Sequence, residues 1–518
     1  MRFVFVICFL LVPRLFARQV PIVLLHTCDL HGNILPTENY EGKTNLGGLA
    51  RCATVIRQIR QQEKKCLLVD AGDTIQGAAI SYLTNGRVMV KALNLLRYDA
   101  WCWGNHEFDW GLDKLAICGE QAQMPILNAN VVRGSDDSAA RVLACIKPYR
   151  IVEVDGVKIG LIGLNTPGVP NWSRPQLIHG LKFADSVETL KTIIPAVQRA
   201  GAKVLVLVCH QGYREGGDDH ANQINAIAQT FPELDVIIGG HTHRNFPEFK
   251  VNNVLYSQAD YFGIHLGRVD LTFDTEAGRV THRESKTIVM DEQVPLDQEL
   301  LKACGQEIDQ AQKVSETILG EAKGDFDVRG APRRESPVHN LICESIAEAL
   351  RARSVRVDAV VHGIFERRGL VKGAITIGDV WKVVPYENYI GVLQLIPDQL
   401  REVLEENAAT YEKREFRGIW GLRWRFDPVS VASNRTTSLT GPDGSDLPEN
   451  GRLAVAFNSY ELASGGLRWN RLRELAELPE TKLTEYDVQT RQAVIDYIRH
   501  HREVVPAIKG WWQAALPR

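Results

Sequence analysis

The segment Trp103-Gly104-Asn105-His106-Glu107-Phe108-Asp109 is the densest concentration of reactive side chains in this sequence. An amide, an imidazole and two carboxylates lie within five residues, directly after a short, mostly apolar run at residues 99–102. No single helix or strand needs that many polar groups for its own stability. The segment is therefore a candidate for chemistry.

Four other segments in the first half of the chain have the same form, an apolar strand-like run that ends on residues of metal-ligand type. These runs end on Asp29 and His31, on Asp73, on His210, and on His241 and His243. In α/β sheets, ligands gather beyond the carboxyl ends of the strands. We therefore expect all five clusters to meet in one place.

The chemistry that suits this set is catalysis by two metal ions. Two ions about 4 Å apart share one bridging carboxylate and need about three further ligands each. The clusters supply that number for two sites that share one aspartate: Asp29, His31, Asp73, Asn105, His210, His241 and His243. Such a pair makes a hydroxide at neutral pH and clamps phosphoryl oxygens during in-line attack. Zinc, manganese and iron all accept these ligands, so the sequence leaves the metal open.

Two neighbours of the ligands would complete the chemistry. His106 would stabilise charge on the transferring group or protonate the leaving alcohol, and Asp109 would orient its imidazole. Each cluster alone is weak evidence, because Gly-Asp after a strand is usually a turn. His26, His220 and His265 are interpreted as structural. The conjunction of five clusters in one domain is the argument for an enzyme.

The elements expected around these clusters alternate. We expect strands at 22–25, 66–70, 149–154, 157–164, 204–208 and 236–238, and helices at 48–61, 186–200 and 219–229. Asp155-Gly156 predicts a hairpin turn. The alternation predicts a layered α/β domain.

Bulk properties limit the classes of protein. At 518 residues, two domains are the starting expectation. A net charge of −3, from 60 basic and 63 acidic residues, argues against a nucleic-acid polymer or an anionic membrane as main partner. Nine cysteines follow Cys8, an odd number without paired spacings, so no disulfide framework is indicated, although one or two bridges remain possible.

The N-terminus has the form of a signal peptide. Residues 1–18 comprise a charged start, an apolar run and a small residue suited to cleavage, Ala17. The alternative is a buried first strand. No later stretch approaches the roughly 18 apolar residues of a membrane helix. We expect a periplasmic or secreted protein without a stable membrane anchor.

The clusters resemble the successive motifs of the calcineurin-like metallophosphoesterases, and Gly-Asn-His-Glu-Phe-Asp resembles the secreted 5′-nucleotidase family more narrowly. This resemblance implies an N-terminal four-layer β-sandwich flanked by helices at 19–290, a linker helix at 291–322 and a C-terminal α/β substrate-binding domain at 323–518. It assigns Asp29, His31 and His243 to one metal, Asn105, His210 and His241 to the other, and Asp73 to both. His106 and Asp109 fall on the family's catalytic pair.

The second half of the chain is similar to the family's nucleotide-binding domain. The resemblance places Tyr386 and Trp469 at the two aromatic positions that hold a base, with core aromatics as the alternative. Where the family has a glycine-rich loop, this chain has His362 to Arg367, although Arg367 is retained as a possible anion clamp. After Gly466, the usual Asp-Gly is Leu467-Arg468.

The resulting prediction is a secreted phosphoester hydrolase with two divalent ions, acting on a nucleotide or nucleotide-sugar bound between the domains. One alternative is a 2′,3′-cyclic-nucleotide phosphodiesterase or a thiosulfohydrolase-like enzyme with altered specificity. Another is a non-catalytic protein that binds metal or nucleotide. The changed loop at 362–367 favours an altered substrate over lost catalysis.

Overall fold

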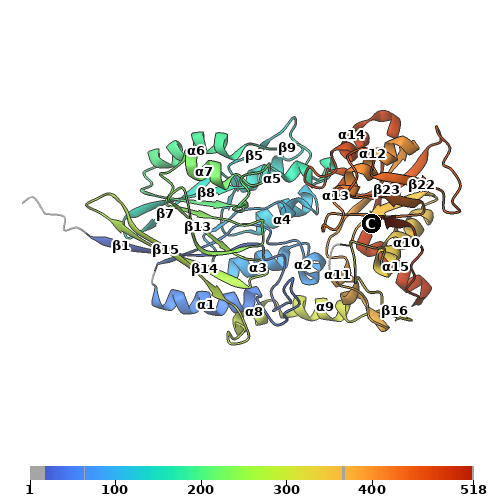
Figure 1. Cartoon of the computed structure of the whole chain (residues 1–518). Helices are drawn as coiled ribbons and strands as arrows, with labels where there is room; N and C mark the ends of the chain where they lie inside the picture. The colour runs from blue at the N-terminus through green and yellow to red at the C-terminus, as the bar shows by residue number, and fades with distance from the viewer. Residues whose placement is uncertain (1–17, 64, 365–367, 516–518) are drawn as a thin grey trace, which may run out of the picture.

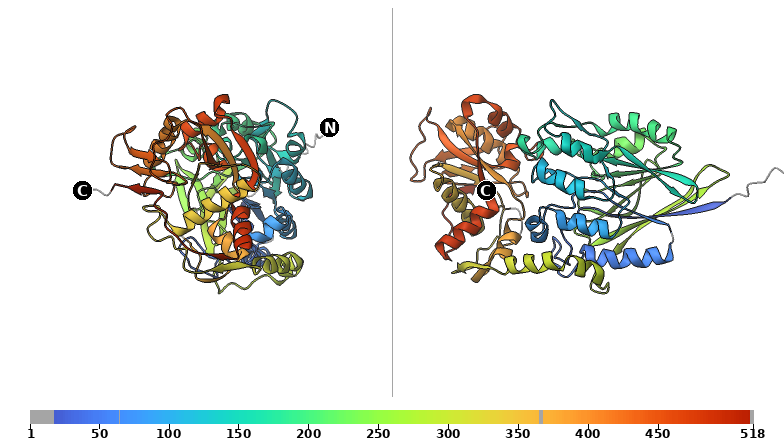
Figure 2. Two further views of the ribbon diagram at one scale, coloured as in Figure 1. Left: turned by 90° about the vertical axis from the view of Figure 1, so that its right-hand side faces the viewer. Right: turned by 180° about the vertical axis from the view of Figure 1, so that it is seen from behind.

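The structure, a computed structural model, describes residues 18–63, 65–364 and 368–515. Two α/β parts lie side by side along the long axis of the molecule (Figure 1). The same two parts are seen from behind in Figure 2, where the C-terminal part is the smaller. The predicted two-domain α/β architecture is confirmed.

The N-terminal part contains a seven-stranded sheet in the order β15-β14-β1-β2-β3-β4-β6. Its strands are β1 Gln19–Thr27, β2 Cys66–Asp70, β3 Ala100–Trp101, β4 Ile126–Leu127, β6 Ile146–Lys147, β14 His265–Asp274 and β15 Arg279–Val289. The neighbouring strands β1, β2, β3, β4 and β6 are parallel, so the carboxyl ends of β1, β2 and β3 lie at the same edge.

A second, six-stranded sheet has the order β12-β13-β11-β10-β8-β7. Its strands are β7 Tyr149–Val154, β8 Val157–Leu164, β10 Val204–Cys209, β11 Val236–Ile238, β12 Asn245–Val251 and β13 Val254–Ala259. Strands β7 and β8 form the hairpin predicted at Asp155-Gly156, and β8, β10, β11 and β13 are parallel.

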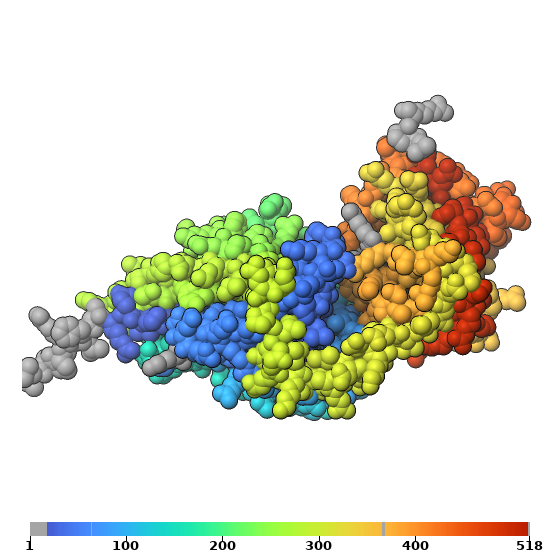
Figure 3. All heavy atoms as spheres, turned by 90° about the horizontal axis from the view of Figure 1, so that it is seen from below, coloured from blue at the N-terminus to red at the C-terminus, as the bar shows by residue number. Residues whose placement is uncertain are grey.

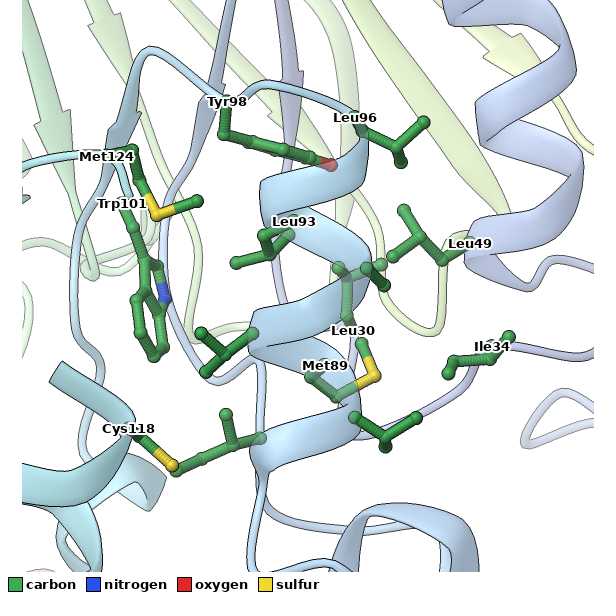
Figure 4. Close-up of a cluster of buried hydrophobic side chains, with 14 of the residues drawn as sticks. Leu30, Ile34, Leu49, Met89, Leu93, Leu96, Tyr98, Trp101, Cys118 and Met124 are labelled. Carbon is green, nitrogen blue, oxygen red and sulfur yellow. The ribbon is translucent and has the colours of Figure 1, made fainter. Parts of the chain in front are cut away.

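Four layers follow from the alternation of side chains along the strands. On β1, Ile22 and Leu24 face the second sheet, whereas Val23 and Leu25 face a helical layer. That layer contains α1 Leu49–Gln62, α3 Arg87–Leu95 and α4 Leu112–Gln121, and Figure 4 shows Met89 and Leu93 of α3 at the centre of its packing. Helices α6 Ser186–Arg199 and α7 Ile224–Thr230 cover the second sheet.

Helix α7 begins five residues later than the helix predicted at 219–229. The Asp219 carboxylate accepts hydrogen bonds from the backbone N–H groups of Ala221 and Asn222. Such local side-chain bonds compete with helix formation, which explains the late start.

The C-terminal part is built on a five-stranded sheet in the order β20-β17-β23-β19-β24. Its strands are β17 Ala359–His362, β19 Tyr389–Leu395, β20 Gly418–Trp420, β23 Leu453–Asn458 and β24 Thr484–Gln489. Helices α10 Pro337–Arg351 and α15 Thr490–His501 pack on one face, and α12 Pro397–Ala408 and α14 Asn470–Glu477 pack on the other.

The segment expected as one linker helix at 291–322 contains two helices and a strand. These are α8 Gln298–Ala303, α9 Gly305–Ser315 and β16 Ile318–Ala322. Helix α9 packs against α2 Ala79–Leu83 of the N-terminal part and α11 Ile377–Val383 of the C-terminal part, so it lies across both, as the yellow-green band in Figure 3 shows. The strand β16 pairs with β18 Gly373–Thr376, so it already belongs to the C-terminal part.

Most of the predicted signal peptide, residues 1–17, lies outside the described residues. Within those that are described, no helix is long and apolar enough to cross a membrane.

Candidate metal centre

All five predicted clusters lie beyond strand ends, and the two sheets contribute them jointly. Strands β1, β2 and β3 of the first sheet lead into the clusters at residues 29–31, 73 and 105–109. Strands β10 and β11 of the second sheet lead into those at residues 210 and 241–243. The centre therefore lies where the carboxyl ends of both sheets converge.

Six of the seven predicted ligands form two groups that share one carboxylate. Asp29, His31, Asp73 and His243 form one group, and Asp73, His210 and His241 form the other. The ligand atoms in each group lie within 4.8 Å of one another. The seventh, Asn105, joins the second group, because its Oδ1 lies 2.9 Å from Nδ1 of His241.

Backbone strain is concentrated at these residues. Five of them have left-handed φ angles: Asp29 (51°), His31 (46°), Asp73 (52°), His241 (71°) and His243 (51°). A non-glycine residue in a sparsely populated conformation costs on the order of 1–3 kcal/mol and persists where the surrounding structure enforces it. The strain turns the side chains inward from the strand ends, which is typical of a functional site.

Backbone carbonyls and one tyrosine orient the imidazoles. Nδ1 of His31 lies 2.9 Å from the Gln76 carbonyl oxygen, and Nδ1 of His210 lies 2.8 Å from that of Ala71. These contacts place the N–H on Nδ1 and leave Nε2 directed at the centre, as in many metal sites. The Tyr40 hydroxyl lies 2.7 Å from Nδ1 of His243 and holds that ring in the same way.

The Glu107 carboxylate fixes the loop that carries the shared aspartate. One oxygen accepts from the backbone N–H groups of Thr74 and Ile75 at 2.6 and 3.1 Å, and the other accepts from those of Asp73 and Gly104 at 2.9 and 2.6 Å. Glu107 is 1% exposed. Its role was not predicted from the sequence, although its position beside Phe108, just after a buried strand, indicated burial.

Glycine is required at position 104 because the loop that carries Gly104 and Glu107 lies very close to the loop that carries Asp73. A Cβ atom there would lie 2.3 Å from Oδ1 of Asp73 and 2.7 Å from its backbone nitrogen. Neither atom has room to move, because the Asp73 N–H donates to Glu107 and Oδ1 accepts from the His106 N–H at 2.8 Å.

The electrostatics favour cation binding. Burial and the neighbouring His243 lower the pKa of His31 to about 4, and burial and His210 lower the pKa of His241 to about 3, so both rings are neutral with an available lone pair. Burial opposes ionisation of Asp73, but His210 and His106 hold its pKa well below the usual range. Burial would lower the pKa of His210, but the Asp73 carboxylate raises it to about 9, so this ring carries a positive charge beside Asp73. The buried set therefore combines neutral imidazoles at His31 and His241 with an ionised carboxylate that attracts positive charge.

The contacts between ligand atoms indicate where positive charge belongs. Nε2 of His31 and Nε2 of His243 lie 3.1 Å apart, and His243 Nε2 lies 3.4 Å from Oδ1 of Asp29. Two lone-pair nitrogens beside a carboxylate need a proton or a cation between them. The residues present therefore fit two divalent ions that share Asp73.

His106 lies at the open side of the centre. Its Nδ1 is 2.6 Å from Oδ2 of Asp109. Burial would lower the pKa of His106, but the Asp109 and Asp73 carboxylates raise it to about 10, so the ring carries a proton. The ring of Tyr386 stacks on it, with centroids 5.9 Å apart and planes at 14°. The predicted pair is thus brought together beside the ligands.

The remaining histidines named from the sequence do not join the metal-ligand groups. His26 is buried beside Ser257, with Nε2 3.0 Å from the hydroxyl oxygen, and His265 lies 3.1 Å from Asp260. The ring of His220 contacts Trp172.

Comparison with known families agrees with both halves of the structure. Residues 22–245 match the family model of the calcineurin-like phosphoesterases, and residues 317–474 match that of the 5′-nucleotidase C-terminal domain. The chain is a calcineurin-like phosphoesterase with a 5′-nucleotidase C-terminal domain. The predicted family is therefore confirmed, and the chain is a phosphoric ester hydrolase.

Individual relatives match over nearly the whole chain. The snake venom 5′-nucleotidase of Crotalus adamanteus is 27% identical, over 95% of this chain and 89% of its own length. The trifunctional nucleotide phosphoesterase protein YfkN of Bacillus subtilis is 27% identical over 91% of this chain, which spans only 34% of that protein. The crystal structure of a 5′-nucleotidase precursor from Thermus thermophilus superposes with a TM-score of 0.74 at 25% identity, covering 96% of this chain and 100% of that chain.

A cavity of about 380 Å³ connects the metal centre of the phosphoesterase domain with the 5′-nucleotidase C-terminal domain. Asn105, His106, Asp109 and His241 line it from the first domain. Tyr386 lines it from the second, where its ring extends the surface formed by His106.

Of the predicted substrate contacts in the 5′-nucleotidase C-terminal domain, Trp469 lies away from the cavity and Arg367 is outside the described residues. Trp469 is 1% exposed and packs in an apolar cluster with Leu472 and Leu475, so it does not line the cavity. Its ring lies beneath Gly465, whose added Cβ would be 2.9 Å from Trp469 Cδ1, which identifies Trp469 as a core aromatic. Arg367 lies outside the described residues.

Two parts of the cavity wall in this phosphoesterase were not predicted from the sequence. The first is Trp172, whose ring contacts that of His241 with centroids 5.1 Å apart. Its loop is hydrogen-bonded to the C-terminal domain, because the Asn171 carbonyl accepts from the Gly466 N–H at 3.1 Å. The second part is a buried ion pair between Arg417 and Glu461. The departure at Leu467-Arg468 was the available signal that this wall had changed.

Proposed function

We propose that this protein is a secreted, two-metal phosphoester hydrolase that acts on a nucleotide or nucleotide-sugar. The observation that carries the proposal is the position of Asp73, which belongs to both ligand groups. A carboxylate shared by two cation sites is the feature that distinguishes a two-ion hydrolase from a single structural metal site.

The proposed ligands of the first ion are Asp29, His31, Asp73 and His243, and those of the second are Asp73, Asn105, His210 and His241. Zinc, manganese or iron would suit this donor set. When bound, such ions would lower the pKa of water toward neutral and would neutralise charge on phosphoryl oxygens.

His106 is the proposed general acid. Its Nδ1 is held by Asp109, which leaves Nε2 as the proton donor toward the cavity, and its raised pKa keeps it protonated until the leaving oxygen gains charge. Donation to that oxygen would give a free alcohol and a neutral imidazole. Asp109 then acts as the positioning residue.

The organic part of the substrate is proposed to lie against Tyr386, on the side of the cavity formed by the C-terminal domain. The ring stack of Tyr386 on His106 supports this assignment, because a substrate held there would have its ester bond next to the proposed acid. The names of the full-length relatives, which are 5′-nucleotidases, support a nucleotide as the substrate class.

A substrate panel tests the proposal. We expect release of phosphate from AMP or UDP-glucose with added Mn²⁺ or Zn²⁺, and loss of that activity with one less bound ion in Asp73→Asn. Preferential turnover of 2′,3′-cyclic AMP would favour the phosphodiesterase alternative. Turnover of no ester, p-nitrophenyl phosphate included, by protein shown to contain metal would contradict the hydrolase proposal and favour a binding protein.

Secretion and the domain limits belong to the same proposal. Residues 1–18 are proposed as a cleaved signal and 19–290 as the phosphoesterase domain. The linker expected at 291–322 ends before β16, so the substrate-binding domain expected at 323–518 is proposed to begin with that strand, at Ile318. Snake venom proteins among the relatives support an extracytoplasmic location. N-terminal sequencing of protein recovered outside the cytoplasm would test the cleavage site.

A further inference from the structure

Arginines from both domains line the cavity between them. Five line it: Arg174, Arg214, Arg414, Arg417 and Arg468. Three of them form ion pairs, Arg174 with Glu485 at 2.7 Å, Arg214 with Asp219 at 2.8 Å, and Arg417 with Glu461. These pairs build the wall and largely neutralise their own charge.

Arg468 differs from those three arginines. Its guanidinium donates to the Tyr460 hydroxyl and lies 5.9 Å from the centroid of that ring. No carboxylate of the described residues lies within 4.0 Å of it. Glu461 lies close enough for the charge of Arg468 to act on it, but Glu461 is fully buried against Arg417. Arg468 therefore contributes a positive charge to the cavity without a carboxylate partner.

The position of Arg468 relates it to the metal centre. A Cβ placed on Gly466 would lie 2.7 Å from Nε1 of Trp172 and 3.6 Å from Nη1 of Arg468, so the guanidinium and the indole border one point. The same indole contacts His241 of the metal centre, with ring centroids 5.1 Å apart. Arg468 and His241, a proposed metal ligand, therefore both lie near the ring of Trp172.

A charged group in a partly enclosed cavity gains most from an anion that replaces its lost hydration. A guanidinium fixed by a phenol hydroxyl is preorganised for a phosphate or carboxylate, because the remaining N–H groups keep their fork geometry. The two-ion centre accounts for only one anionic group, the one that reacts.

We propose that Arg468 and Tyr460 form a second anion subsite, and that the preferred substrate is a phosphoester with another phosphate or a carboxylate on its organic part. This inference rests on the proposed hydrolase function and names its substrate class. It also explains why the cavity wall has ion pairs and arginines where an uncharged base would need flat apolar faces.

Paired substrates test the subsite. Adenosine 3′,5′-bisphosphate against AMP measures the effect of a second phosphate, and 3-phosphoglycerate against glycerol 3-phosphate measures that of a carboxylate. p-Nitrophenyl phosphate reports the reaction without a second anion. The variants are Arg468→Met, Arg468→Lys, and the matched control Arg452→Met, whose exposed side chain bonds only the Gln394 carbonyl.

We expect the wild type to favour the doubly anionic member of at least one pair by about 10-fold in kcat/KM, a typical value for a hydrogen bond to a charged group. The preference should disappear in Arg468→Met through KM, persist in part in Arg468→Lys and remain in Arg452→Met, and turnover of p-nitrophenyl phosphate should be unchanged in that control. The pair that shows the preference identifies the second group as phosphate or carboxylate.

Two results would overturn the subsite. If p-nitrophenyl phosphate is hydrolysed but the wild type prefers neither doubly anionic substrate, the subsite is wrong and the hydrolase proposal stands. If metal-loaded protein turns over none of the esters, both are wrong. The wild-type comparison needs no variant, so a folding defect in Arg468→Met does not prevent the decision.

Discussion

Glu107→Gln tests whether a buried carboxylate holds the metal centre in shape. Both Glu107 oxygens accept two backbone N–H groups each, and none of the four contacts offers a proton acceptor to an amide NH₂. Glutamine keeps one oxygen. Its NH₂ group would then face two N–H donors, either those of Thr74 and Ile75 or those of Asp73 and Gly104.

The expected loss follows from the bonds that break. Two hydrogen bonds to a charged acceptor are worth about 1.5–3 kcal/mol each, so stability should fall by roughly 3–6 kcal/mol. That is a large part of the 5–15 kcal/mol of a typical domain and corresponds to roughly 10 °C in melting temperature. Burial raises the pKa of Glu107 to about 7, but four donated N–H groups and no donated proton are the pattern of the ionised form.

The loss of turnover should exceed what the loss of folded protein explains. The reason is that the N–H of Asp73 is one of the four donors, and Asp73 is the proposed bridge. The assays are thermal unfolding, metal content per chain and turnover of p-nitrophenyl phosphate at about 25 °C, where the variant is still folded. Glu120→Gln, a substitution on the surface of α4 that removes an ion pair with Arg141, is the control and should change none of the three. A Glu107→Gln protein with wild-type melting temperature and metal content would refute the reasoning.

Three further predictions concern the same region. Gly104→Ala should lower melting temperature and metal content, at a cost of about 1–3 kcal/mol, because the new Cβ would meet Asp73, whereas Gly305→Ala, with open space around the Cβ, should change neither. His106→Asn should reduce kcat about 100-fold and leave bound metal unchanged, and an unchanged kcat would exclude it as the acid. Burial lowers the pKa of His26 to about 3, so the unfolded chain binds the proton first and stability should decrease by about 1.4 kcal/mol per pH unit from pH 6.5 toward 3. His26→Gln should make that slope shallower in urea titrations, and equal slopes would contradict the assignment.

The ligand clusters were predictable because they follow a local rule. Each one stands at the end of a short apolar run, and parallel strands bring such ends to one edge whatever the details of packing. The count of ligands indicated that one aspartate is shared, and the family resemblance assigned that role to Asp73. The φ angles that turn these side chains inward were not predictable, since they depend on the two sheets meeting.

The roles of Glu107 and Trp469 were not predictable, for a different reason. Glu107 binds backbone N–H groups more than 30 residues away, at Asp73 and Thr74, and any residue type except proline can supply an N–H, so no sequence pattern marks the partners. Trp469 stands at a position that the resemblance assigns to substrate, but the packing of Leu472 and Leu475 decides that its ring is buried. Side-chain direction within a domain depends on its neighbours, which position alone does not specify.

The two halves of the active site are therefore under different physical constraints. On the metal side, several contacts hold each residue. The strained backbone at residues such as Asp73 is held by Glu107, and backbone carbonyls hold the histidine rings. Few substitutions therefore leave this side intact. The opposite wall contains ion pairs and the guanidinium of Arg468, which has no carboxylate partner among the described residues, and this wall can change charge without disturbing the ligands. A chain with this construction can keep the hydrolytic chemistry of its family while the substrate that reaches it changes.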